Sequence, residues 1–221
     1  MNRKKLISSF IGLTVALVIL CVSALTASAK TEDGLKYLSV GDYKKAEASF
    51  KGILKDDADN KEASYYLGLT CLLQEDFKES LDIFKNLLKT SGKKSAVKSN
   101  EIPTKGQVVI GLVRSYLGLK KYEDAHESLI VAEEVEADPV EILTYKGALY
   151  LEKNEDRKAY DTLKKAVKLN SKNPYTYYYA GVANIRMGKP KDAVKLFEHF
   201  LDMAPYVPEA KNARILVDTL C

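Results

Sequence analysis

Residues 181–197 read GVANIRMGKPKDAVKLF and hold the pattern that decides the fold. A glycine opens the stretch, the small residue Ala193 stands twelve positions later, and the large apolar residue Phe197 follows four positions after that. Between them, MGKP (187–190) combines a glycine suited to a helix C-cap with a proline suited to the first turn of a new helix. The stretch therefore predicts two helices joined by a tight turn.

The same frame recurs along the chain at an almost fixed interval, with steps of 34, 45, 34 and 34 residues between successive copies of Ala193. These second small positions are Ala46, Ser80, Ala125, Ala159 and Ala193. The first small positions, twelve residues earlier, are Gly34, Gly68, Val113, Gly147 and Gly181. The large apolar positions are Phe50, Phe84, Leu129, Leu163 and Phe197. A period of this length indicates a repeat protein whose units bury their apolar faces against one another.

Glycine at the first small position needs a physical reason, because glycine within a helix costs about 1 kcal/mol relative to alanine. We expect the compensating gain to come from a close approach of the two antiparallel helix backbones in each unit, with no side chain between them. The short breaks between the two helices of a unit are expected at VGD (40–42), QED (74–76), KNE (153–155) and MGKP (187–190).

Several segments resemble the tetratricopeptide repeat (TPR) family where its second helix opens. They are GDYKKA (41–46) with Phe50, KYEDA (121–125), and GKPKDA (188–193) with Phe197 and Pro205. The chain departs from that family's pattern because only Pro205 matches its terminal proline. The resemblance implies an all-α fold, a right-handed α-solenoid of about five helix-turn-helix units. It also implies a binding scaffold, because the family consists of such scaffolds. Their partners are very varied, so the resemblance indicates no particular partner.

In this register the repeat domain spans residues 30–207. Its units run over 27–60, 61–94, 106–139, 140–173 and 174–207. The extra residues form a Ser/Lys-rich inserted loop over 95–105, either a solvated linker or a basic site for an acidic partner. Residues 208–221 predict a capping helix, because the outer apolar face of a last repeat needs a cover.

The amino terminus has the composition of a targeting element. NRKK (2–5) is a basic head, residues 6–25 are uncharged and rich in Leu, Val and Ile, and ASA (27–29) fits a small-x-small cleavage site. The apolar stretch exceeds the usual signal core of about 7–15 residues and approaches the roughly 20 that span a bilayer. Residues 1–29 are therefore either a signal peptide cleaved after Ala29 or a membrane anchor. Either outcome predicts an extracytoplasmic protein, and the basic head fits a bacterium.

Charge and residue counts exclude several functions. Without residues 1–29 the chain has 31 basic and 30 acidic residues, so no electrostatic footprint for nucleic acid remains. His126 and His199 are not at metal-ligand spacing, and no catalytic constellation, metal site or cofactor motif is present. Cys71 stands at a core position and predicts a buried inert thiol, whereas Cys221 is either a free thiol or an intermolecular disulfide partner.

The resemblance places a partner in a concave groove lined by the first helices of the units. The candidate binding residues are Tyr65, Leu69, Arg114, Thr144, Tyr175, Tyr178 and Arg186. Aromatic residues and arginine dominate binding energy at interfaces. Arg114 and Arg186 are the stronger candidates, because charge on an inner face gains little from stacking. For Tyr65 and Tyr178, packing between adjacent first helices is the competing interpretation.

Some members of the family hold a peptide's C-terminal carboxylate with lysine and asparagine at set inner positions. Those positions here carry Thr31, Leu35, Tyr66, Gln107 and Gly111, so that mode is not expected. The sequence predicts a non-enzymatic scaffold, exported or membrane-anchored through residues 6–25, that binds a protein or peptide partner. The alternative is a self-assembling component of the cell envelope, and an enzyme or enzyme accessory is the third hypothesis.

Overall fold

The computed structural model describes residues 30–91, 102–169 and 171–220. All regular secondary structure in these residues is helical, as the repeat pattern predicts. No helix in these ranges is both long and apolar enough to cross a membrane. The targeting segment 1–29, most of the inserted loop and Cys221 lie outside the described residues.

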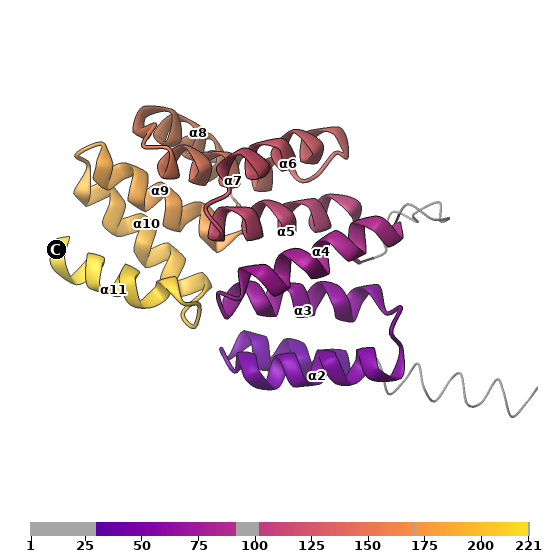
Figure 1. Ribbon diagram of the computed structural model, residues 1–221. Helices are drawn as coiled ribbons and strands as arrows, with labels where there is room; N and C mark the ends of the chain where they lie inside the picture. The colour runs from indigo at the N-terminus through magenta and orange to yellow at the C-terminus, as the bar shows by residue number, and fades with distance from the viewer. Residues whose placement is uncertain (1–29, 92–101, 170, 221) are drawn as a thin grey trace, which may run out of the picture.

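The helices form antiparallel pairs that stack into a curved array (Figure 1). In chain order they are residues 30–39 with α2 (Tyr43–Asp56), α3 (Lys61–Leu73) with α4 (Phe77–Ser91), α5 (Lys105–Gly118) with α6 (Tyr122–Glu134), α7 (Pro139–Glu152) with α8 (Asp156–Lys168), α9 (Pro174–Arg186) with α10 (Pro190–Met203), and the single helix α11 (Glu209–Leu220). The first helices also contact one another, α3 with α5, α5 with α7, and α7 with α9. Each unit therefore depends on its neighbours for a core.

The turns within the pairs end the first helix with a left-handed residue. Gly41 has φ 77° and Gly188 has φ 70°, and the same place holds Glu75 with φ 62° and Asn154 with φ 57°. The residue after each turn donates its backbone N–H to a carbonyl five residues earlier, as Asp76 does to Cys71 at 2.8 Å. This is the Schellman arrangement that satisfies the last carbonyl groups of a helix. The turns thus lie where the sequence predicts them.

The recurring glycines serve a purpose that differs from the sequence prediction. We expected bare backbones to meet, but a large side chain from the second helix fills the space above each glycine. A methyl group added at Gly68 would lie 2.8 Å from Phe84 Cζ, and one added at Gly181 would lie 2.7 Å from Phe197 Cε1. Because the glycine has no side chain, it leaves a space that the large apolar residue of the same unit fills. Pattern spacing alone could not show this, because it does not report the rotation of one helix against the other.

The second small positions are fully buried in every unit, Ser80 included. Ser80 Oγ donates to the carbonyl oxygen of Gly68 at 3.0 Å and lies 2.9 Å from Ser115 Oγ. Ser115 Oγ in turn donates to the carbonyl oxygen of Gly111 at 2.9 Å. A buried hydroxyl needs such a partner, since an unpaired one costs about 1–3 kcal/mol. Serine is therefore accommodated where the other units have alanine, and it links the second unit to the third.

Helix α11 covers the last pair, with Ala210 and Ala213 buried against α10. The segment that leads into α11 also meets the first unit. Tyr43 Oη donates to the carbonyl oxygen of Tyr206 at 2.7 Å, and a methyl group at Gly41 would lie 2.9 Å from Tyr206 Cβ. Figure 1 shows the loop before α11 near the start of α2. The array therefore curves far enough for its two ends to touch.

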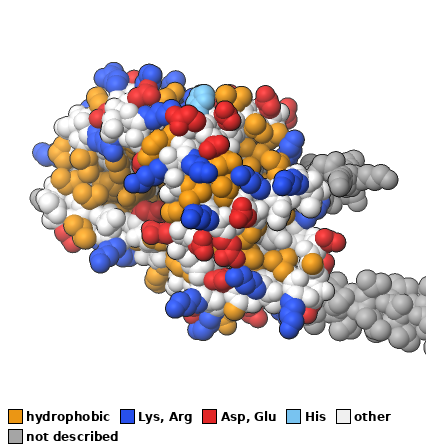
Figure 2. All heavy atoms as spheres, viewed as in Figure 1, with side chains coloured by type: hydrophobic (Ala, Val, Ile, Leu, Met, Phe, Trp, Pro, Cys, Tyr) orange, Lys and Arg blue, Asp and Glu red, His pale blue; other side chains and the backbone are white. Residues whose placement is uncertain are grey.

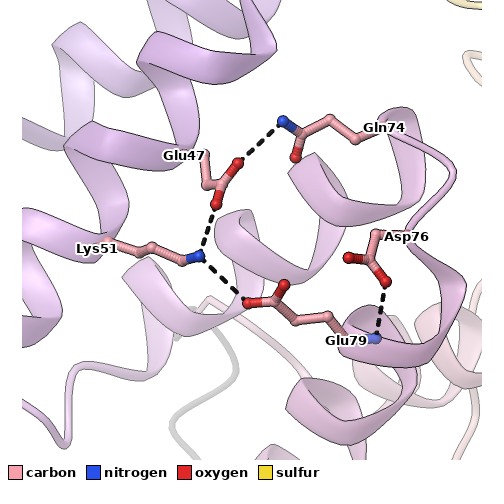
Figure 3. Close-up of polar contacts among 5 residues, drawn as sticks. All are labelled: Glu47, Lys51, Gln74, Asp76 and Glu79. Atoms are coloured by element: carbon pink, nitrogen blue, oxygen red, sulfur yellow. Dashed lines mark hydrogen bonds and ion pairs between the residues drawn. The ribbon is translucent and has the colours of Figure 1, made fainter.

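A polar cluster joins the first two units on their second helices (Figure 3). Lys51 Nζ of α2 lies 2.6 Å from Glu47 Oε1 and 3.3 Å from Glu79 Oε1 of α4. Gln74, at the C-cap of α3, donates to Glu47 Oε2 at 2.9 Å. The hydrogen bond from Lys51 is the main cause that lowers the pKa of Glu47 below its ordinary value of 4.5. Lys51 thus stands between two carboxylates of adjacent units.

Replacing Lys51 with methionine is expected to lower the free energy of unfolding by about 0.5–1 kcal/mol near neutral pH, since the pair is half exposed. The pKa of Glu47 is lower in the folded protein, so its contribution is present above the unfolded value and is lost as pH falls through the folded one. The difference between wild type and Lys51→Met should therefore shrink in acid. Urea unfolding near neutral pH and again in acid measures this difference. Lys44→Met, on the exposed face of α2, is the control. A difference that grows in acid would contradict it.

Cys71 is 1% exposed, as the sequence predicts for a core thiol. Burial raises its pKa to about 12. Because the thiolate is the reactive form, we expect negligible alkylation of Cys71 by iodoacetamide in the folded protein at about pH 8, and rapid alkylation in concentrated urea. Mass spectrometry of the peptide that contains Cys71 measures both. Rapid labelling without urea would mean that the second unit opens locally.

Candidate binding groove

A groove of about 780 Å³ lies on the inner side of the array. Tyr65 and Leu69 of α3 lie on one side, Ile110 and Arg114 of α5 lie in the middle, and Tyr145 of α7 lies beyond them. The beginnings of α5, α7 and α9 complete its lining. The first helices therefore supply its walls, which agrees with the predicted place for a partner.

Arg114 occupies the centre of this groove. Its guanidinium carbon lies 5.1 Å from the ring centroid of Tyr175 and 5.8 Å from that of Tyr145. Both distances are within the range of a cation–π interaction. The two rings come from α9 and α7, so units three, four and five meet at this one side chain. A second hollow of about 190 Å³ continues beyond it and is also lined by Arg114, Tyr145 and Tyr175.

Hydrogen bonds hold the polar residues around Arg114. Asn173 caps α9 through its Oδ1, which accepts from Tyr175 N at 2.9 Å. Its Nδ2 group donates to Glu141 Oε2 at 2.9 Å and to Tyr145 Oη at 3.2 Å. On the other side, Tyr175 Oη donates to Glu209 Oε2 of α11 at 3.1 Å. Both tyrosines are thus fixed in orientation, and their ring faces are held against the guanidinium.

Burial sets the protonation of these groups. It raises the pKa of Tyr65 and of Tyr145 to about 12, so both hydroxyls are neutral at physiological pH. Burial also raises the pKa of Glu141, although Arg114 and the hydrogen bond from Asn173 oppose that effect. The tyrosines therefore present neutral aromatic faces, and Arg114 carries the positive charge among them. Within the part of the chain that is described, no group of three His, Cys, Asp or Glu side chains could hold a metal ion.

Comparisons with known proteins agree with this architecture. A family model described as tetratricopeptide repeat matches residues 33–95. A thermophilic TPR protein of Thermus thermophilus is 21% identical, with a TM-score of 0.69 over 88% of this chain and 98% of that one. The chain has the tetratricopeptide-repeat fold. A TPR protein of Parabacteroides merdae gives 15% identity and a TM-score of 0.70 over 99% of this chain and 78% of that one.

Human IFIT1, in a dimer with m7Gppp-AAAA, also shares the TPR fold. It is 16% identical, with a TM-score of 0.68 over 88% of this chain and 46% of that one. No curated protein matches the chain significantly. These identities are too low to transfer a partner, so the comparisons establish the fold.

Four of the residues proposed from the sequence lie together in the groove of this TPR array. They are Tyr65, Leu69, Arg114 and Tyr175. The other three are engaged elsewhere. Thr144 is 0% exposed and lies 2.6 Å from Thr176 between their hydroxyl oxygens, so it is buried between α7 and α9. The ring of Tyr178 packs 5.1 Å from that of Phe200, in the core of the last unit.

Arg186 does not line the groove either. Its Nη1 donates to the carbonyl oxygen of Leu151 at 2.7 Å and to Asp156 Oδ1 at 3.0 Å. It therefore ties the last TPR unit to the turn between α7 and α8. Tyr145 and Asn173 also belong to the groove, although the repeat pattern did not predict them. Asn173 carries a local signal, because asparagine before a proline suits a helix N-cap, but its contacts across units carry none.

Proposed function

We propose that this TPR protein is a non-enzymatic scaffold that binds an extended segment of a protein partner in its groove. The observation that carries the proposal is the cluster of Tyr65, Arg114, Tyr145 and Tyr175 around one open hollow. Tyrosine and arginine are the residue types most enriched at energetic hot spots of protein interfaces. The composition of residues 1–29 supports action outside the cytoplasm, after export or from a membrane anchor.

The dimensions and chemistry of the groove favour a peptide. It reaches from α3 to the start of α9, and so crosses four first helices. Leu69 and Ile110 offer apolar contact, while the side-chain amide of Gln107 adds a polar group to the same lining. Such alternation of apolar and hydrogen-bonding groups suits an extended chain, whose own side chains and backbone alternate in the same way.

The charge distribution does not favour nucleic acid. On the face drawn in Figure 2, Lys and Arg side chains are interspersed with Asp and Glu, so that face presents no broad basic area. The groove itself is lined by three acidic residues, Glu136, Asp138 and Glu141, beside Arg114 and Lys172. A phosphate chain would meet these carboxylates, whereas a polypeptide need not.

Photo-crosslinking in intact cells tests the proposal. Benzoylphenylalanine is placed at Leu169, which lines the groove and is 55% exposed, and separately at Ile130, which is 47% exposed on α6 and lies outside it. We expect a discrete adduct with another protein from position 169 and not from position 130. The same adducts from both positions, or none from 169, would overturn the proposal. An adduct of this chain with itself at 169 would favour the self-assembly alternative instead.

The proposed location has its own measurement. Mass spectrometry of the native amino terminus should find a chain that begins at Lys30 if residues 1–29 are cleaved, or the uncleaved terminus in the membrane fraction if they are retained. Recovery of the uncleaved chain from the cytosol would contradict both forms of the proposal.

A further inference from the structure

We propose that the groove selects its peptide by a single acidic side chain, whose carboxylate binds the guanidinium of Arg114. This inference rests on the proposed function and specifies its partner. Arg114 belongs to the lining of two hollows of about 780 and 190 Å³. The lining of the larger one extends from Leu69 of α3, on one side of Arg114, to Pro174 at the start of α9 on the other, which favours an internal residue over a chain terminus.

The guanidinium of Arg114 has aromatic neighbours but no hydrogen-bond partner in the described residues. Tyr175 and Tyr145 lie against it at 5.1 and 5.8 Å. Among the described residues no hydrogen bond or ion pair engages Arg114, and no buried side-chain nitrogen or oxygen lacks a partner. Its unpaired N–H groups must therefore open to the groove. Guanidinium donors form a planar fork that matches the two oxygens of a carboxylate.

Three nearby carboxylates of the chain itself accept hydrogen bonds from groups other than Arg114. Glu141 Oε2 accepts from Asn173 at 2.9 Å, and Asp138 Oδ1 accepts from Val140 N at 2.8 Å as the cap of α7. Glu209 Oε2 accepts from Tyr175 Oη at 3.1 Å. Arg114 differs from Arg186, which is satisfied by Leu151 and Asp156. The contrast identifies Arg114 as the guanidinium available to a ligand in this groove.

The same acidic residues set what can flank the carboxylate. Glu136 and Asp138 are exposed and Glu141 is half-buried, and all three line the groove with Arg114. A ligand with several adjacent negative charges would be repelled at these positions, so a polyphosphate or a run of acidic residues fits poorly. One acidic side chain between neutral or basic residues would pair with Arg114 and bring no further negative charge near the acidic residues of the groove. The geometry therefore specifies a peptide with an isolated Asp or Glu.

Two displayed peptide libraries test the inference on the full-length protein. One library fixes Asp or Glu at the centre, the other fixes Asn or Gln there, and both have random flanking positions. Chosen peptides are synthesised again with amidated C-termini, which removes the terminal carboxylate. We expect binders from the acidic library alone, with affinity about 10- to 100-fold lower for Arg114→Gln. Arg114→Lys, which keeps the charge but loses the fork, should lose part of the affinity. Arg157→Gln is the control, because Arg157 pairs with Asp161 on α8 and lines neither hollow.

The outcomes separate this inference from the proposed function. Groove binders without acidic preference, unaffected by Arg114→Gln, would overturn the inference and leave the peptide-binding function standing. Binding that requires a free C-terminal carboxylate would also overturn it. If neither library yields a peptide that competes with the crosslink at position 169, the inference fails while the function stands, whereas absence of the crosslink itself overturns both. A melting curve of each variant by circular dichroism confirms that the loss of affinity is not a loss of fold.

Discussion

Replacing Phe84 with alanine is expected to lower the free energy of unfolding by about 3–5 kcal/mol, the range for truncating a buried phenylalanine. Phe84 is 0% exposed and stands between two units. A methyl group at Gly68 would lie 2.8 Å from its Cζ, and one at Gly111 would lie 2.6 Å from its Cε1. Its ring also lies 6.0 Å from that of Tyr65. Truncation would therefore empty a space bounded by α3 and α5 at once.

The position of Phe84 also predicts how the protein unfolds. Repeat arrays are held by contacts between neighbours, so weakening one junction can separate the two sides of the array. We expect urea unfolding of Phe84→Ala, followed by far-UV circular dichroism, to broaden or divide into two transitions. Ile130→Ala is the control, because Ile130 is a large apolar residue on the surface of α6 and its truncation should cost little. An equal, small loss for both variants would contradict the packing described for Phe84.

Substituting alanine for two helical glycines is expected to give effects of opposite sign. A methyl group at Gly147 would lie 2.4 Å from Leu163 Cγ, and Leu163 is 0% exposed. The branch carbon of a packed leucine cannot move without a change of rotamer, so overpacking should cost about 1–3 kcal/mol. At Gly52, in the middle of α2, nothing lies within 4 Å of the added methyl group. Gly52→Ala should therefore stabilise the helix by about 0.5–1 kcal/mol.

Urea titrations of both variants measure this pair, with the slope of the transition as a check that the extent of unfolding is unchanged. Each protein serves as the control for the other, since both substitutions add one methyl group to a helix. A gain in stability for Gly147→Ala would mean that Leu163 does not fill the hole above Gly147. A loss for Gly52→Ala would mean that helix propensity does not govern stability at that position.

The location of the groove was predictable from the sequence, whereas its composition was only partly so. Helical spacing together with the family resemblance placed Tyr65, Leu69, Arg114 and Tyr175 on inner faces, and in the structure they line one hollow. The same spacing proposed Arg186, which has partners on the neighbouring unit. Spacing reports which face of a helix a residue occupies, and it carries no information on which residues of the next unit come within reach.

By itself, the sequence determined the helix pairs, their turns and the burial of Ala46, Ala125 and Ala193, because these depend on distances of a few residues along the chain. Only the tertiary structure decided that glycine holes receive large side chains, and that Arg114 lies between two tyrosines of other units. It also decided that Tyr43 meets Tyr206 across the whole length of the array. Such contacts follow from rotations between successive units, which accumulate along the stack and leave no trace in the pattern of any one repeat.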